Sequence, residues 1–200
     1  MTPRLTRAGF IEHGALVLGG AVALAAAGCG GSSGTTLVGA PLGTIDDAAI
    51  GRVALAAESL AMDLYARAAR TAGVAPAMRD YLESARENER AHRTALSAAL
   101  GESGPSGLRF AYPPGAFGAP AAAMLQAAAL EQALVGQYLG AVSQLRDVGL
   151  RLLAARIAAN HAQHLGAVSS PLGGDPAAVP SLPAVLTTLE AADAVAPFLA

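Results

Sequence analysis

Four apolar segments of this chain carry Glu or His residues that a helix would point inward, and this combination restricts the fold more than any other feature. Glu89 and His92 are three residues apart, so both side chains would lie on nearly one face of a helix. In chain order, the candidates are Glu58, Glu89, His92, Glu131, His161 and His164. Inward Glu and His side chains from four helices are typical of a metal site in the core of a helix bundle.

The neighbours of these residues predict that they are buried. Around Glu58, Glu131 and His161, the residues one and two turns away on the same face are Ala, Leu, Met, Ile, Val or Tyr, the pattern of a core-facing stripe. A carboxylate buried without a partner is strongly unfavourable, and a divalent metal can satisfy several at once. Pairing with a buried Arg and a place at the bundle rim are the alternatives for the two lone Glu residues. For Glu89 and His92 the alternatives are a surface ion pair or a core His whose nitrogens are satisfied by hydrogen bonds. Off the stripe, Glu83, Arg86, Glu87 and Arg90 are predicted to face solvent.

The order of helix signals predicts an all-α fold with two antiparallel helix hairpins joined by a long crossover. Helices are expected over residues 44–72, 76–100, 120–145 and 148–170, and a short helix over the tail 188–199. Thr44 and Asp147 are expected to cap the first and fourth helices, and Gly101 to follow the second. Short loops join the helices within each hairpin, whereas residues 101–119 connect the hairpins. This is a four-helix bundle with one long crossover, occupying residues 44–200.

The two hairpins resemble copies of each other. In each one a Glu is followed seven residues later by a Tyr, and then 33 or 34 residues after the Glu by a His. The copies are Glu58, Tyr65 and His92, and Glu131, Tyr138 and His164. This match indicates an internal duplication. Tyr65 and Tyr138 are expected to be core residues with a satisfied hydroxyl, or neighbours of the metal ligands.

The first 28 residues are predicted to be an export signal that ends in a lipidation site. Arg4 and Arg7 precede an apolar run of thirteen residues, which as a helix would be ~20 Å long and too short to span ~30 Å of hydrocarbon. Cys29, the only Cys, follows this run directly and resembles the lipidated residue of a bacterial lipobox. Residues 29–43, rich in Gly and Ser, are expected to form a flexible tether. The export route, Sec or twin-arginine, stays open.

Taken together, these motifs resemble the ferritin-like superfamily, and the chain is similar to small exported ferritin-like domain proteins of bacteria. The resemblance covers Glu58 to Tyr65, Glu89 to His92, Phe110 to Phe117, Leu130 to Ala141 and Ala196 to Leu199. In dimetal members, two helices each supply one Glu, and the other two each supply Glu-x-x-His. By position these ligands are Glu58, Glu89, His92, Glu131 and His164, with His161 standing where the sixth ligand should be Glu.

That exchange bears on the number of metal ions. A carboxylate can bridge two ions, whereas a neutral imidazole nitrogen binds one. His161 is therefore expected to weaken the second metal position, or to act as a neighbour of the ligands in a degenerate site. Manganese catalases, which are similar in fold, are thought to use three carboxylates and two histidines. The donor set suits iron or manganese, as one or two ions, with zinc as a further option.

Three classes of function follow from the resemblance. The first is an oxidoreductase that uses dioxygen, peroxide or ferrous iron, the second a non-catalytic metal-binding protein, and the third a scaffold with a degenerate site. The formal charge of −2 and the absence of an Arg run argue against nucleic-acid binding. Through a lipid anchor at Cys29, the protein would sit in the cell envelope, on the outer side of the cytoplasmic membrane. Such an anchor makes a closed ferritin cage an unlikely assembly.

Overall fold

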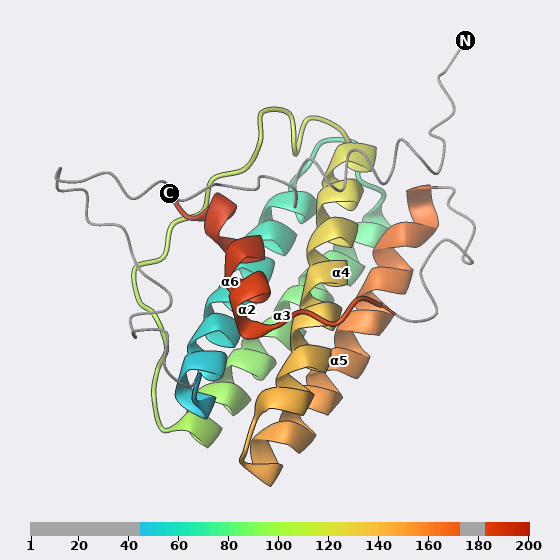
Figure 1. The fold of residues 1–200 in the computed structure, drawn as a ribbon. Helices are drawn as coiled ribbons and strands as arrows, with labels where there is room; N and C mark the ends of the chain where they lie inside the picture. Colours follow the sequence, from blue (N-terminus) through green and yellow to red (C-terminus); the bar gives the residue numbers. More distant parts are fainter. Residues whose placement is uncertain (1–44, 173–182) are drawn as a thin grey trace, which may run out of the picture. The chain divides into compact units, whose positions relative to one another are not determined.

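Four long helices in two hairpins make up most of the structure (Figure 1). This computed structural model describes residues 45–172 and 183–200. The helices are α2 (Asp47–Ala69), α3 (Pro76–Leu100), α4 (Pro120–Gln144) and α5 (Val148–Ser169), with a short α6 (Thr188–Val195). One-turn 3-10 helices, Ser170–Leu172 and Ala196–Phe198, follow α5 and α6. The predicted all-α bundle with a short C-terminal helix is confirmed, whereas the predicted signal, Cys29 and the tether lie outside the described residues.

Most helix ends follow their sequence signals. Pro76 opens α3, and Gly101 closes it in the left-handed conformation at φ 68°. The carboxylate of Asp147 caps α5 by accepting a hydrogen bond from the Leu150 amide at 2.8 Å. The predicted start of the first helix was three residues too early, because α2 begins at Asp47 and Asp46 is its cap. Asp46 accepts from the Ala49 amide at 2.7 Å, which satisfies an amide that the helix itself leaves unpaired.

The centre of the bundle is formed by α2 and α4, which pack against each other while α3 and α5 flank them. The buried side chains of α2 and α4 are largely Ala, with Leu and one Tyr each. Small side chains let these two helices approach closely. Their Glu and Tyr residues are thereby brought face to face across the bundle axis.

The segment after the second hairpin crosses the outer face of α4 before α6 packs on α2 and α4 (Figure 1). The Leu186 amide donates to the Gly136 carbonyl at 3.0 Å. At Gly140 an added Cβ would lie 1.7 Å from the Leu186 carbonyl oxygen, so only Gly fits this crossing. Val53, Ala191 and Ala192 then form a small apolar cluster with Leu186.

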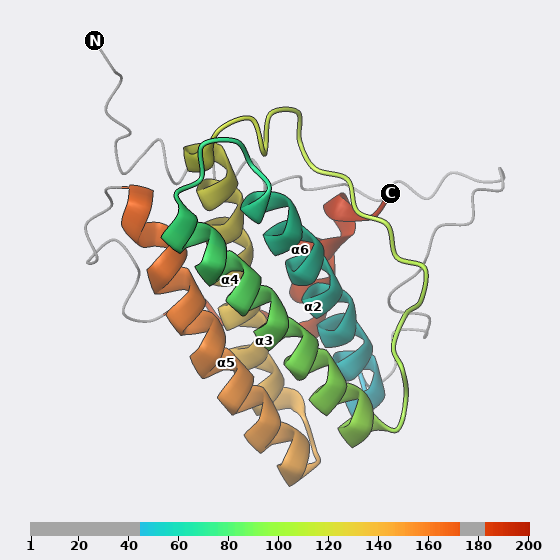
Figure 2. The same ribbon diagram turned by 180° about the vertical axis from the view of Figure 1, so that it is seen from behind.

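The crossover between the hairpins runs along the α2 side of the bundle (Figure 2). The end of the chain holds it there, because Ala111 donates to the Phe198 carbonyl at 2.8 Å and Ala200 to the Arg109 carbonyl at 3.0 Å. Tyr112 donates to Asp63 on α2 at 3.0 Å. No helix in the described ranges has the length and apolar character needed to cross a membrane.

The residues of α3 that were predicted to face solvent are exposed, with one exception. Glu83, Glu87 and Arg90 are exposed as predicted. Arg86, predicted to face solvent with them, is half-buried instead. It faces the side on which the crossover covers the first hairpin, a long-range contact that helix periodicity does not reveal.

Candidate metal centre

The interior of the bundle holds the six residues that the sequence singled out. Glu58, Glu89 and His161 are fully buried, and Glu131 and His164 almost so. The His92 side chain retains 13% exposure. The burial predicted for the two lone Glu residues and for His161 is therefore confirmed. The alternatives of a rim position and a surface ion pair are excluded for the three Glu residues.

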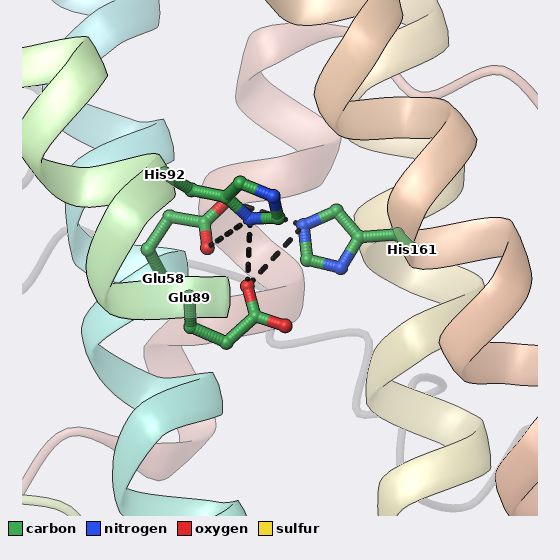
Figure 3. A group of neighbouring side chains, drawn as sticks. All are labelled: Glu58, Glu89, His92 and His161. Carbon is green, nitrogen blue, oxygen red and sulfur yellow. Dashed lines mark hydrogen bonds and ion pairs between the residues drawn. The ribbon is translucent and has the colours of Figure 1, made fainter. Parts of the chain in front are cut away.

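Four of the six meet at one point. Glu58, Glu89, His92 and His161 each offer one ligand atom, and these atoms all lie within 4.8 Å of one another (Figure 3). His92 Nδ1 is 2.9 Å from Glu89 Oε2 and 3.3 Å from Glu58 Oε2. His161 Nε2 is 3.1 Å from Glu58 Oε1 and 3.7 Å from Glu89 Oε2. Three helices, α2, α3 and α5, supply this group.

Glu131 holds His161 rather than joining this group. Its Oε2 is 2.9 Å from His161 Nδ1, and its Oε1 accepts a hydrogen bond from the Tyr65 hydroxyl. In the protonated ring, Nδ1 donates to Glu131 and Nε2 faces Glu58 and Glu89; loss of the Nε2 proton would leave that nitrogen free to bind a metal ion. A carboxylate that fixes the far nitrogen of an imidazole in this way is common around metal-bound histidines.

His164 lies at the edge of the cluster. Its Nε2 is 3.6 Å from Glu89 Oε1, and its Nδ1 is 2.7 Å from the Tyr81 hydroxyl. Asn88 Nδ2 approaches His164 Nε2 at 3.4 Å. Sequence reasoning missed Tyr81 and Asn88, although Tyr81 is eight residues before Glu89, two helical turns back on the same face.

The two tyrosines make crossed hydrogen bonds between the hairpins. Tyr65 on α2 donates to Glu131 on α4, and Tyr138 on α4 donates to Glu58 on α2. The Tyr138 ring also stacks on His161, with ring centroids 5.3 Å apart. Burial and the neighbouring carboxylates raise the pKa of both tyrosines well above the usual value, so both remain hydrogen-bond donors at neutral pH. The geometry fits the expectation that they neighbour the proposed ligands.

Protons neutralise much of this cluster in the absence of a metal. Burial disfavours a charged His92, but hydrogen bonds with Glu58 and Glu89 outweigh it and raise the pKa of His92 to about 9. Burial and the charge of Glu58 raise the pKa of Glu89 to about 9. For Glu58, burial is outweighed by the charge of His161 and by hydrogen bonds, which hold its pKa well below the ordinary range.

The two histidines of α5 differ in their protonation. Burial opposes a charged His161, yet the surrounding carboxylates Glu131, Glu58 and Glu89 raise its pKa well above the usual value. Burial lowers the pKa of His164, so this imidazole is neutral at pH 7. His161 therefore carries positive charge between the carboxylates, where a cation would otherwise be needed.

The donor set fits a transition metal. Oxygen and nitrogen donors in a mixed carboxylate and imidazole set suit iron, manganese or zinc. Glu89 Oε1 is buried and has no hydrogen-bond partner among the described residues, which leaves a lone pair available at the cluster. Because metal ligands must lose their protons, an ion entering this site would displace those that the cluster now holds.

Comparison with known proteins agrees with this description. A family model described as a ferritin-like domain matches residues 46–174, more than half of the chain. The match begins after the predicted signal and tether. No curated protein matches the chain.

Proposed function

The chain belongs to the ferritin-like domain family, and we propose that it binds a redox-active metal ion in the core of its bundle. Glu58, Glu89, His92 and Nε2 of His161 would hold the ion. The observation that supports this proposal is their convergence within 4.8 Å inside a buried interior. Iron or manganese, when bound, would supply one-electron steps for reactions with dioxygen, peroxide or ferrous iron.

The protein's own residues would position and shield the site. Tyr138 holds Glu58 through Oε1, whereas Oε2 faces His92. Glu131 fixes the ring of His161. The surrounding Ala and Leu side chains of α2 and α4 are buried, which limits access of water. The carboxylates and imidazoles can also take up or release protons as substrates bind, since several hold a proton at neutral pH.

Metal content is the decisive measurement. The full chain would be purified, loaded with ferrous or manganous ion, freed of excess metal and subjected to elemental analysis. Wild type is expected to retain metal, and Glu89→Gln to lose most of it. Glu83→Gln, an exposed substitution on the same helix, is the matched control and should bind like wild type. Failure of the wild type to retain any of these ions, or zinc, would refute the metal site.

A non-catalytic role is the alternative, as a metal-binding protein or as a ferritin-like scaffold with a degenerate site. The presence of His161 where Glu is expected favours this alternative, because the positive charge of its ring already balances negative charge on the buried carboxylates. Turnover separates the two functions. Consumption of peroxide or oxidation of ferrous iron that disappears in Glu89→Gln but not in Glu83→Gln supports an oxidoreductase, whereas bound metal without turnover supports the alternative.

We further propose that the protein acts in the cell envelope, anchored through a lipid on Cys29. The proposal is supported by the position of Cys29 directly after an apolar run and before a Gly- and Ser-rich stretch. Two or more acyl chains give stable anchoring, at ~0.8 kcal/mol for each buried CH₂. Cys29→Ser should release the protein from the membrane fraction or leave the signal uncleaved. A wild-type protein that fractionates as soluble and carries no lipid would contradict the proposal.

A further inference from the structure

A basic cavity of about 850 Å³ lies between the first hairpin and the crossover. It is lined by one face of α2, by α3, and by crossover residues 105–110. Figure 2 shows the crossover running beside α2. Its arginines are Arg67, Arg70, Arg86, Arg93 and Arg109. None of the six predicted metal ligands lines it. The cavity is therefore separate from the candidate metal centre.

The charge of the cavity is strongly unbalanced. Asp63 is the only acidic side chain among the lining residues, and it already pairs with Arg67 at 2.7 Å. It also accepts a hydrogen bond from Tyr112. Five guanidinium groups thus face a single acidic side chain among the described lining residues, in a chain whose formal net charge is −2.

Two of these arginines have a buried nitrogen that nothing in the described chain satisfies. The Nε atoms of Arg86 and Arg93 are buried and have no hydrogen-bond partner among residues 45–172 and 183–200. The two are seven residues apart on α3, so their side chains project from the same face, two turns apart. An unpaired buried donor on a charged group is more unfavourable than one on a neutral group. Such donors are ordinarily satisfied by a partner, which the described residues do not supply.

We propose that this cavity binds a phosphate-bearing anion. Guanidinium groups present several N–H donors in a plane and bind phosphate oxygens in pairs, with both charge and geometry in their favour. Arg86 and Arg93 form the α3 wall, Arg70 belongs to the α2 wall, and Arg109 comes from the crossover. A phosphoryl group between them would accept hydrogen bonds from the guanidinium groups and neutralise the excess charge. The ligand could be a free phosphoryl compound or the headgroup of an anionic phospholipid.

Calorimetric titration of the full chain with pyrophosphate, after chelation of any metal, tests the proposal. One pyrophosphate per chain is expected. Arg93→Gln and Arg86→Gln should each weaken binding at least about tenfold, because each removes a charged guanidinium group that can give two hydrogen bonds to a phosphate. Arg109→Gln on the crossover should weaken it too, and cannot act by disturbing helix packing. Arg156→Gln, an exposed substitution on α5 outside the cavity, is the matched control and should change binding by less than about twofold.

A vesicle-binding experiment distinguishes a phospholipid headgroup from a free phosphoryl compound. Flotation would compare vesicles of phosphatidylcholine alone with vesicles that also contain phosphatidylglycerol. Binding to the anionic vesicles that Arg93→Gln abolishes, without pyrophosphate binding, supports the proposal and assigns a lipid headgroup. Pyrophosphate binding that Arg93→Gln weakens supports it and assigns a soluble ligand. The proposal is overturned if neither probe binds, or if Arg156→Gln and Arg93→Gln bind equally well.

Discussion

The two hairpins carry the same kinds of side chain around the centre of the bundle, but they use them differently. In the α2–α3 hairpin, Glu58, Glu89 and His92 converge and compete for the same protons. In the α4–α5 hairpin, both oxygens of Glu131 are hydrogen-bonded, one to Tyr65 and the other to His161. His164 is instead held by Tyr81. A repeated sequence pattern has thus produced one converging half and one supporting half.

The difference follows from the exchange of Glu for His at position 161. A second carboxylate there would repeat the arrangement of Glu89 and His92. The imidazole of His161 instead lies between Glu131, 2.9 Å from Nδ1, and Glu58, 3.1 Å from Nε2. A positively charged ring at this place holds the carboxylates together as a cation would. On this basis we expect the proposed site to hold one ion, coordinated mainly by the first hairpin.

The largest expected effect is a difference in metal affinity between variants of the two lone glutamates, Glu58 and Glu131. Glu58→Gln should weaken metal affinity by at least about 100-fold, because Glu58 is a proposed ligand, whereas Glu131→Gln should weaken it only about tenfold, as is usual for groups that orient a ligand. The measurement is metal affinity by competition with a chelator of known strength. Equal losses would show that the hairpins act alike and would break the comparison.

The second prediction restores the missing carboxylate. His161→Glu should raise the metal content from close to one ion per chain to close to two, since the new carboxylate and His164 would repeat the Glu89 and His92 spacing. Without metal, the variant should melt at a lower temperature than wild type, because a further acid then joins three buried ones. Elemental analysis after identical loading gives the counts. Two tightly bound ions in wild type, or an unchanged count in the variant, would show that His161 is not the limiting residue.

The third prediction concerns metal removal and pH. Chelation should lower the melting temperature, because an ion that binds only the folded state stabilises it. In the chelated protein, stability should fall as pH rises from 6.5 to 9. The pKa values of Glu89 and His92 are both raised to about 9, so the folded state holds protons that the unfolded state has lost in this range.

Thermal melts at several pH values measure this dependence. Glu89→Gln should flatten it by removing one of the groups whose pKa is raised, which also include His92 and His161. Substitutions at His164, whose pKa is lowered, should leave the slope between pH 6.5 and 9 nearly unchanged. Metal affinity should rise with pH over the same range, since binding displaces the protons. A melting temperature insensitive to both chelation and pH would favour a scaffold without a working site.

The smallest expected effect compares the two tyrosines. Tyr65→Phe and Tyr138→Phe should each destabilise the metal-free fold by about 1–3 kcal/mol, since each removes a hydrogen-bond donor from a buried carboxylate oxygen. Tyr138→Phe should also reduce metal affinity more than Tyr65→Phe, because its partner is Glu58. Chemical unfolding and chelator competition measure the two effects. A larger affinity loss in Tyr65→Phe would place Glu131 nearer to the ion than Glu58.

The helices and the buried stripe were predictable because both depend on local patterns. Apolar spacing marks the helices, and Pro76, Gly101 and Asp147 mark their ends within a residue. The start of α2 was predicted three residues too early, because the cap is Asp46 rather than the expected Thr44. The half-burial of Arg86 escaped prediction, since it depends on where the crossover passes.

The division of roles within the site was not predictable from spacing. The positions of Glu131 and His164 match the ligand pattern as well as those of Glu58 and His92 do. Only the three-dimensional arrangement shows that Tyr65 and His161 occupy the oxygens of Glu131. Contacts between α3 and α5, such as Tyr81 with His164, join residues 83 positions apart. Helix periodicity contains no information on such pairs.

The crossed tyrosine bonds have a consequence for how such a chain arose. Each hairpin contains the donor that the other hairpin's glutamate needs, which is the reciprocal relation found at a twofold-symmetric dimer interface. If the hairpins arose by the predicted duplication, a single ancestral hairpin could have satisfied its buried acid by pairing with an identical copy of itself. Gene fusion would then have freed the two copies from the requirement of identity. The exchange of one carboxylate for His161 is the kind of change that a symmetric pair, altered at both sites by every mutation, could not have made on one side alone.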